Sequence, residues 1–324
     1  MLIGMTAISF VVSQAVPADP VAANLGERAA GDPEIVASYR AKWGLDRPLH
    51  EQYGVYLWRV MQGDLGTSIS TNQPIAAELR RHLPATIELA VTAMAISILL
   101  GIPLGILAAV KRDSAVDQAA RLVSLIGVSM PIFWLGLIAI MVFYAKLGWA
   151  PAPGRLSARI EPPEFITGFV LIDAVIARRP DLAADAIKHL ILPALVLASS
   201  SMGVITRMMR GSMLEILGED YVRTARSKGL SERSVTLRHA ARNSLLPVVT
   251  IIGLSFGGLL SGAVVTESVF SWPGLGRYAF RSATSLDFPA IMGVGIVVAG
   301  VYILVNLLVD VTYALLDPRV RVGG

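Results

Sequence analysis

The most prominent feature of the chain is a series of long apolar stretches that contain no charged residue. A transmembrane helix needs about 20 such residues, because an α-helix rises about 1.5 Å per residue and the bilayer core is about 30 Å thick. A soluble core helix seldom runs this long without a charge, so the repeated pattern predicts an all-α integral membrane protein. The stretches are residues 1–18, 89–110, 122–145, 189–206, 243–266 and 288–309.

Six transmembrane helices follow from these stretches. We predict a first transmembrane helix at 1–16, an extracytoplasmic region at 17–82, a transmembrane domain at 83–316 with a cytoplasmic loop at 215–244, and a cytoplasmic tail at 317–324. The six predicted spans are residues 1–16, 83–110, 122–147, 187–209, 245–270 and 288–316.

The first predicted span is short, because a helix over residues 1–16 covers only about 24 Å. We therefore expect either that the natural protein begins upstream of Met1 or that this helix is unusually short. Residues 15–18 also resemble the small-residue cleavage site of a secretory signal peptide. No Lys or Arg precedes the apolar run, which favours a transmembrane helix over a signal peptide.

Charge placement predicts the orientation, because Lys and Arg accumulate on the cytoplasmic side. Residues 207–242 carry eight basic and four acidic side chains, and residues 111–121 carry three and two. By contrast, residues 17–84 carry seven basic and eight acidic side chains, and residues 148–188 carry five of each. The first two segments and both termini are therefore predicted to be cytoplasmic.

Composition excludes several kinds of site. The chain is 54% hydrophobic and 16% charged, with a net charge of +4 and no cysteine, so disulfides and cysteine-ligated metals are impossible. Four histidines lie far apart, and none pairs with another at the spacing of metal ligands. We expect no metal site, no bound cofactor and no nucleic-acid partner.

Two other classes of membrane protein fit the sequence poorly. An ion-coupled secondary carrier usually buries ionisable residues near mid-membrane, whereas Glu88, Glu267 and Asp310 lie near the ends of spans. A membrane-embedded enzyme would need a nucleophile with a base, or paired carboxylates, on one face, and no such constellation occurs. We expect no catalytic residues.

The regions outside the spans leave two interpretations open. Residues 33–43 and 48–61 read as amphipathic helices rich in aromatic residues, which could form an interfacial aromatic belt or part of a platform for a solute receptor. Residues 165–177 are too short to span, and residues 268–287 are rich in turn formers and could be re-entrant. The glycines of the spans, such as those at 253–262, serve either close helix contact or a transport pathway.

The charged segment 219–247 carries the clearest local structural signals. Residues 220–228 should form a short helix, which Gly229 can end in a left-handed conformation. Ser231 can cap a second short helix over residues 232–242, before Pro247 in the first turn of the fifth span. This helix–Gly–helix elbow is either an ordinary basic cytoplasmic loop or a docking element that transmits displacement into the spans.

The same segment resembles the cytoplasmic EAA loop of ABC importer permeases, in the version found in the dipeptide/oligopeptide permease family. Of the general Glu-Ala-Ala-x3-Gly motif only Ala225 and Gly229 match, and the later proline of that motif is replaced by Arg242. The family's own pattern is matched densely at residues 220–230, 238–240 and 245–247. Further matching stretches are residues 63–66, 83–86, 129–134, 192–195, 266–267, 272–276 and 310–321.

The resemblance covers about residue 17 to the end, and it indicates the first of two paired permeases. One departure is at the start, where relatives carry an Arg-rich tail and a longer first span. The loop residues that correspond to the coupling site of the family are Glu219, Asp220, Tyr221, Arg223, Thr224, Ala225, Arg226, Lys228, Gly229 and Leu230. Within this set, we expect Tyr221, Ala225 and Leu230 to fill a groove on an ATPase, while the basic residues orient the contact.

The resemblance implies a type I ABC permease fold in the bacterial inner membrane and a defined set of partners. These are a second homologous permease, two cytoplasmic ATPase subunits, an extracytoplasmic solute-binding protein and membrane lipid. The chain has no Gly-x4-Gly-Lys-Ser/Thr phosphate loop, so ATP hydrolysis is expected on the partner ATPases. The implied solute is a small peptide, and the alternatives within the family are a nickel complex, glutathione, an opine or a sugar.

Overall fold

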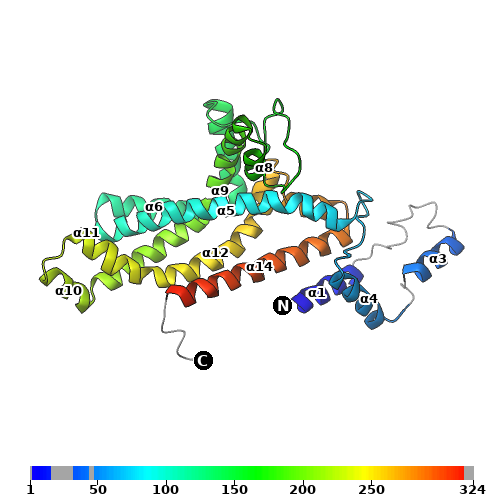
Figure 1. Cartoon of the computed structure of the whole chain (residues 1–324), viewed down its shortest axis with the longest axis horizontal. Coiled ribbons are helices and arrows are strands. Elements are labelled where there is room, and N and C mark those ends of the chain that lie inside the picture. Colours follow the sequence, from blue (N-terminus) through cyan, green and yellow to red (C-terminus); the bar gives the residue numbers. More distant parts are fainter. Residues whose placement is uncertain (1, 16–31, 44–46, 317–324) are drawn as a thin grey trace. The chain divides into compact units, whose positions relative to one another are not determined.

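The structure is a computed structural model that describes residues 2–15, 32–43 and 47–316. Within these ranges the chain is mostly helical, with a single isolated β-bridge between Thr67 and Pro74, so the predicted all-α class is confirmed (Figure 1). The predicted tail at 317–324 lies outside the described residues. The helices are α1 (Leu2–Ala15), α3 (Pro33–Trp43), α4 (Leu49–Met61), α5 (Ile75–Val110), α6 (Ala115–Ser129), α7 (Ile132–Ala139), η1 (Ile140–Lys146), α8 (Val170–Ile176), α9 (Pro180–Leu217), α10 (Asp220–Ser227), α11 (Glu232–Ser234), η2 (Val235–Ala241), α12 (Arg242–Val269), α13 (Leu275–Thr284) and α14 (Phe288–Leu316).

The chain divides into two compact units, which are described separately. Unit 1 comprises Met1–Leu83 with Tyr278–Val301, and unit 2 comprises Pro84–Arg277 with Tyr302–Gly324. Helices α5, α13 and α14 each contribute to both units. The functional elements that the sequence predicts between α9 and α12 all belong to unit 2.

Four helices of the described chain are long and apolar enough to cross a membrane, and a bent pair could supply a fifth span. The chain is therefore a multi-pass membrane protein. The predicted first span corresponds to α1, which has only 14 residues and does not reach spanning length, so a count of six remains a prediction. The spanning helices are Ile75–Val110, Pro180–Leu217, Glu232–Leu260 and Phe288–Val309, and the bent pair is Ala115–Ser129 with Ile132–Lys146.

The predicted single span at residues 122–147 is wrong in its shape. Helices α6 and α7 meet at an angle of 108°, so this stretch is either a broken span or a re-entrant loop, and it is not one straight helix. The break falls at Met130 and Pro131, where the residue before a proline is pushed out of the helical region and the proline lacks an N–H. Met130 accordingly has extended φ and ψ angles of −80° and 132°.

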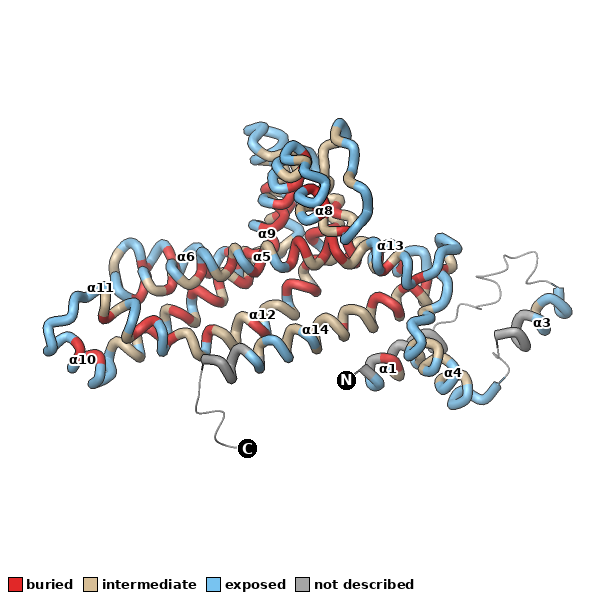
Figure 2. The backbone as a smooth tube through the Cα atoms, in the orientation of Figure 1, coloured by how far each residue is buried: buried red, intermediate tan, exposed pale blue. Residues whose placement is uncertain are grey.

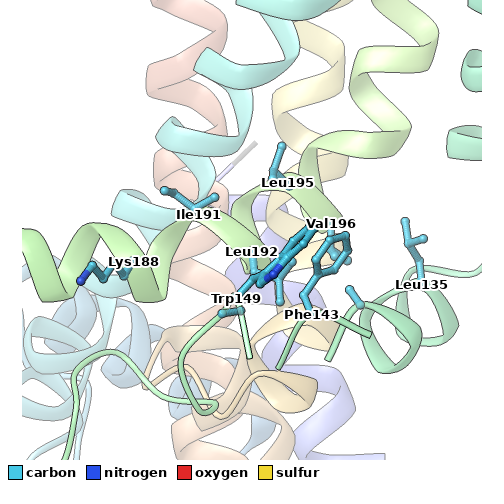
Figure 3. Close-up of a pocket in the computed structure, with 10 residues that line it drawn as sticks. Leu135, Phe143, Trp149, Lys188, Ile191, Leu192, Leu195 and Val196 are labelled. Atoms are coloured by element: carbon cyan, nitrogen blue, oxygen red, sulfur yellow. The ribbon is translucent and has the colours of Figure 1, made fainter. Parts of the chain in front are cut away.

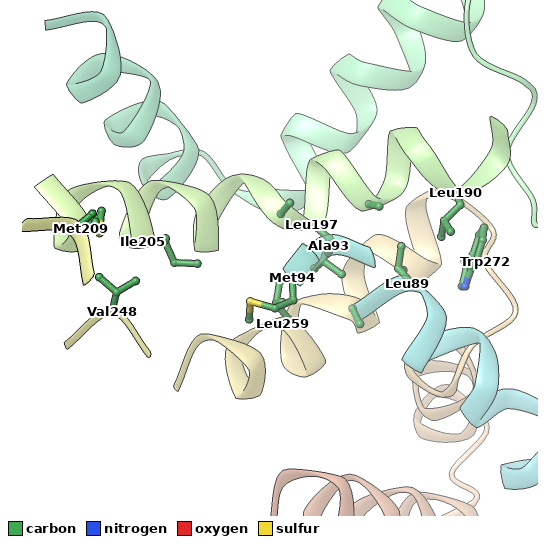
Figure 4. Packing of buried hydrophobic residues seen from close by; sticks show 14 of the residues in the cluster. Leu89, Ala93, Met94, Leu190, Leu197, Ile205, Met209, Val248, Leu259 and Trp272 are labelled. Atoms are coloured by element: carbon green, nitrogen blue, oxygen red, sulfur yellow. The ribbon is translucent and has the colours of Figure 1, made fainter. Parts of the chain in front are cut away.

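Helix α9 is the centre of unit 2 and packs against α5, α6 and α12. Helices α5, α9 and α12 share one cluster of buried apolar residues. Figure 4 shows Leu197, Ile205 and Met209 of α9 facing the other members of this cluster. Small residues allow the close approach, because a Cβ on Gly105 would lie 2.7 Å from the Cβ of Met209, and one on Gly203 would lie 2.6 Å from the oxygen of Ser124. At these positions the glycines serve helix contact, one of the two roles that the sequence left open.

A buried carboxylate joins helices α6 and α9. Asp117 has no exposed surface, and its two oxygens accept hydrogen bonds from Nε and Nη2 of Arg210 at 2.6 and 2.8 Å. Arg121 donates to the same carboxylate at 2.6 and 3.2 Å, and the amide of Asp113 donates at 3.0 Å. Asp117 also lies in the first turn of α6, where the helix dipole favours a negative charge. The ion pairs thus tie α6 to α9 across 93 residues of sequence.

The turn-rich segment after α12 is anchored to the first turns of α5 within unit 2. Trp272 is buried and its Nε1 donates to the carbonyl of Ala85 at 2.9 Å. Glu267 accepts a hydrogen bond from the hydroxyl of Thr86, which in turn accepts one from the amide of Leu275 at 2.7 Å. Two glycines of the Trp-Pro-Gly-Leu-Gly run make this possible, because a Cβ at residue 274 would overlap the Glu267 carboxylate and one at residue 276 would lie 2.4 Å from the Cα of Val264.

In unit 1, Asp287 fixes the polar turn that precedes α5. The carboxylate accepts hydrogen bonds from the hydroxyls of Ser68 and Ser70 at 2.5 and 2.9 Å, and from the Ser70 amide at 3.1 Å. Burial on its own would raise the pKa of Asp287, but these hydrogen bonds outweigh it and hold the pKa below its ordinary range. The carboxyl is therefore ionised at neutral pH and keeps the turn in place.

Candidate functional site

The predicted elbow lies between the two long helices α9 and α12. Helices α10 and α11 form it, and both lie at the same end of these two helices (Figure 1). The backbone coloured by burial shows that α10 carries a buried side and an exposed side (Figure 2). All ten predicted site residues lie in this elbow or at its borders, so the structure brings them together.

The buried side of α10 is apolar and faces the elbow itself. Val222 is fully buried, Ala225 is 6% exposed, and both pack with Val235 of η2 against partly buried Ile216 and Leu217 at the end of α9. The spacing of three residues between Val222 and Ala225 places them on one helix face. This cluster holds α10 against the ends of its neighbours.

Ala225 therefore cannot have the role that the sequence predicted for it. Its methyl group is enclosed by Val235 and the end of α9 and is not available to a groove on another protein. Tyr221 and Leu230, the other two residues of that prediction, are each 41% exposed. Val222, which the sequence reasoning missed, shares the inward role, and its spacing from Ala225 was the signal that could have found it.

Gly229 ends α10 in the left-handed conformation that the sequence predicted, with φ +76°. The amide of Gly229 donates to the carbonyl of Arg226 at 2.9 Å, and the amide of Leu230 donates to the carbonyl of Ala225 at 3.4 Å. These two bonds are the pair expected of a Schellman motif, in which a residue with positive φ closes the helix. No atom lies within 4 Å of the position that a Cβ would occupy at Gly229, so the need for glycine comes from its backbone conformation alone.

The second half of the elbow differs from the prediction. Ser231 caps it as expected, because its Oγ accepts a hydrogen bond from the amide of Ser234 at 3.4 Å. The following residues, however, form no separate short α-helix over 232–242. After one turn of α11 the chain becomes the π-helix η2, which runs without a break into α12. The elbow is thus continuous with the span that follows it.

A hydrogen-bonded link ties α10 to the base of α12. Nδ2 of Asn243 donates to the Tyr221 hydroxyl at 2.8 Å and to the carbonyl of His239 at 3.2 Å. Sequence reasoning missed this contact of Asn243, because nothing in the local pattern relates it to a tyrosine 22 residues earlier. A movement of α10 would therefore displace the first turn of α12, through this link and through the apolar cluster.

The exposed side of α10 is polar and carries charges of both signs. The side chain of Arg223 is 72% exposed beside Asp220, and Arg226 is 40% exposed and pairs with Glu232 through Nε and Oε1 at 2.9 Å. Glu219, Thr224 and Lys228 are also exposed. Among the described residues, no group of three His, Asp or Glu could hold a metal ion.

Comparison with protein families matches nearly the whole chain. A family described as "Binding-protein-dependent transport system inner membrane component" matches residues 101–322, and its N-terminal companion family matches residues 1–90. The elbow lies wholly within the first match.

Curated relatives cover the same extent. The chain is 46% identical over 99% of its length to the probable D,D-dipeptide transport system permease protein DdpB of Escherichia coli, and covers 94% of that protein. It is 46% identical to the dipeptide transport system permease protein DppB of the same organism, with 98% and 94% of the two chains covered. A di/tripeptide permease DppB of Pseudomonas aeruginosa is also 46% identical, over 98% of this chain and 94% of that protein.

Among solved structures, the chain is similar to a subunit of the inward-facing MetNI methionine ABC transporter. The TM-score is 0.55 with 14% sequence identity, and the match covers 74% of this chain and 96% of that one. At this identity the similarity concerns the fold alone. It agrees with the type I permease fold that the sequence resemblance implied.

Proposed function

This chain belongs to the family of inner-membrane components of binding-protein-dependent transport systems, and we propose that it conducts small peptides as one of two permeases in an ATP-driven importer. The choice of peptides rests on relatives at 46% identity that are dipeptide and di/tripeptide permeases. A nickel complex, glutathione, an opine or a sugar would be carried by the same machinery.

The observation that carries the mechanism is the two-sided α10. Its inner side is fixed to the ends of α9 and α12 by the cluster around Val222 and by the link from Tyr221 to Asn243. Its outer side presents Tyr221, Leu230 and basic side chains to solvent. An ATPase that binds the outer side of α10 and moves on ATP binding would displace α9 and α12 together.

The proposed assembly supplies what this chain lacks. Two ATPase subunits would dock on α10 and on the corresponding helix of a second, homologous permease, and a solute-binding protein would deliver the peptide from outside. The sequence holds no phosphate loop for ATP, so hydrolysis must come from the partner subunits. We assign the ten site residues to this docking interaction, with Ala225 acting through the internal packing of α10.

Uptake by intact cells tests the transported solute. We expect that cells lacking this chain lose ATP-dependent accumulation of labelled dipeptides and that a plasmid copy restores it. Competition with unlabelled dipeptides should reduce the restored uptake, while nickel, glutathione, opines and sugars should not. Restored uptake that one of those other solutes blocks, and dipeptides do not, would replace the peptide in this proposal and leave the importer mechanism in place.

Thiol labelling tests the proposed orientation, in which the elbow and both termini are cytoplasmic. The chain contains no cysteine, so a single one can be introduced at Ser227 in α10 or at Ser70 in unit 1. Because Lys and Arg accumulate inside, we expect a membrane-impermeant reagent on intact cells to label residue 70 and not residue 227, with both labelled after lysis. Labelling of residue 227 alone in intact cells would invert the orientation.

A further inference from the structure

An apolar groove lies on unit 2 between the segment α7–η1 and the first half of α9. It has a volume of about 410 Å³, within the range of roughly 300–1,000 Å³ typical of ligand pockets. Figure 3 shows Leu135 and Phe143 on one wall, with Leu192, Leu195 and Val196 of α9 on the other. The wall formed by Leu135 and Phe143 belongs to α7 and η1, the segment that follows the bend at Met130 and Pro131.

The π-helix and the loop after it shape one end of the groove. The amides of Trp149 and Ala150 both donate to the carbonyl of Phe143, at 2.8 and 3.0 Å, which folds the loop back over the end of η1. This places the Trp149 ring 6.1 Å from the Phe143 ring, measured between centroids. Trp149 is nevertheless 74% exposed, as is common for tryptophans that lie at the level of lipid headgroups.

One residue of the groove lining, Lys188, is positively charged. Lys188 lines the groove and lies directly before the charge-free stretch at residues 189–206, which places it at the boundary between bilayer and water. Among the described residues it forms no ion pair. Asp185, one turn earlier, accepts hydrogen bonds from the amide and hydroxyl of Ser157 at 2.8 and 2.6 Å and also interacts electrostatically with Lys188. Lys188 is exposed, so its ammonium group can also contact an anion outside the protein.

We propose that this groove binds an anionic phospholipid, with one acyl chain along α9 and its phosphate at Lys188. The apolar residues of α9 that line the groove follow Lys188 on the same helix face. They are Leu192, one helical turn deeper into the bilayer, and Leu195 and Val196, two turns deeper. The lining is apolar, as an acyl chain is. The positive charge of Lys188 complements a negative phosphate and lies at the membrane depth of the headgroups.

The lysine at one end of the groove favours a lipid over a helix of another subunit. An anionic phospholipid joins apolar acyl chains to a charged headgroup, which is the arrangement of the apolar lining and Lys188. The inference requires only that the chain spans the membrane, and it does not depend on docking of an ATPase at α10.

Photocrosslinking of lipid tests the site. The transporter is purified through a tag on this chain, in nanodiscs of phosphatidylethanolamine and phosphatidylglycerol that contain a phosphatidylglycerol with a photoreactive acyl chain. We expect mass spectrometry to find the crosslinks concentrated in residues 143–149 and 191–196. Lys188→Gln should lower their yield about five-fold, the effect of one basic residue at an anionic surface.

Two further variants separate charge from space. Lys146→Gln removes a lysine from the end of η1 that does not line the groove, and it should leave the yield unchanged. Leu195→Trp fills the groove at a 42% exposed position with the charge intact, and it should lower the yield as strongly as Lys188→Gln. Evenly scattered crosslinks, or equal yields from Lys188→Gln and wild type, would overturn the proposal.

A photoreactive amino acid at residue 195 provides an independent readout, because the adduct reveals what occupies the groove. An adduct with phospholipid is expected. If the adduct is instead another protein chain of the complex, the groove is a subunit interface and the lipid site does not exist.

Discussion

Gly229→Val is expected to abolish most peptide transport while leaving the chain in the membrane. Residue 229 has φ +76°, a conformation that costs an ordinary residue about 1–2 kcal/mol and is worse for a β-branched side chain. The strain would be relieved by unwinding the Schellman motif, which displaces Leu230 and rotates the exposed side of α10. We expect transport to fall about ten-fold or more, and ATP hydrolysis stimulated by the solute-binding protein to fall with it. Both activities are measured on the reconstituted complex, together with its subunit stoichiometry.

Matched variants separate this effect from a general loss of folding. Gly229→Asn should retain most activity, because asparagine tolerates the left-handed conformation better than other residues with a side chain. Gly211→Ala, in α9, has open space around its Cβ and a helical backbone, and it should behave as wild type. Should Gly229→Val assemble normally and transport at the wild-type rate, the mechanism assigned to the elbow loses its main support.

The second large effect is expected from Asp117→Ala, which should destabilise the whole transporter. The change removes the shared acceptor of Arg210 and Arg121 and leaves Arg210, whose side chain is only 19% exposed, without its carboxylate. Breaking such a pair by deleting one partner is usually far more damaging than replacing both. We expect the midpoint of thermal unfolding to fall by on the order of 10 °C, as followed by size-exclusion chromatography of heated complexes.

Neighbouring substitutions give the comparison that this prediction needs. Asp113→Ala removes a carboxylate that is 72% exposed and pairs with exposed arginines, so it should have little effect. Asp117→Ala combined with Arg210→Met should recover part of the lost stability, because the poorly exposed Arg210 charge is then gone and the half-exposed Arg121 still pairs with Asp113. Equal midpoints for Asp113→Ala and Asp117→Ala would show that the buried pair does not hold these helices together.

Local signals in the sequence predicted the elbow well. A short helix, a glycine that must adopt positive φ and a serine cap are all encoded within a dozen residues, and the structure has each of them. The bounds of α3 and the apolar cores of the spans were equally accessible, because periodicity and proline positions determine them. The positions of the ten site residues could therefore be read from the sequence, although their interaction with an ATPase remains a proposal.

The features that could not be predicted depend on contacts between distant parts of the chain. The sequence was interpreted as a single span at residues 122–147, and the 108° bend between α6 and α7 was missed. The inward orientation of Ala225 depends on Val235 and the end of α9, and the role of Glu267 depends on Thr86, which lies 181 residues away. Local patterns in a single sequence carry no information about such pairs.

The π-helix η2 determines how the membrane-spanning helix α12 is rotated about its axis relative to the elbow. A π-helix accommodates one extra residue in a turn, and one residue of an α-helix corresponds to about 100° of rotation. Farther along the same continuous helix, Gly253 and Gly257 meet Val309 and Tyr302 of α14 at distances that permit no Cβ. The contact between α12 and α14 is therefore oriented relative to α10 by the seven residues of η2. A change of one residue in the length of η2 would rotate this contact relative to α10, while the residues of the contact and of α10 stay the same.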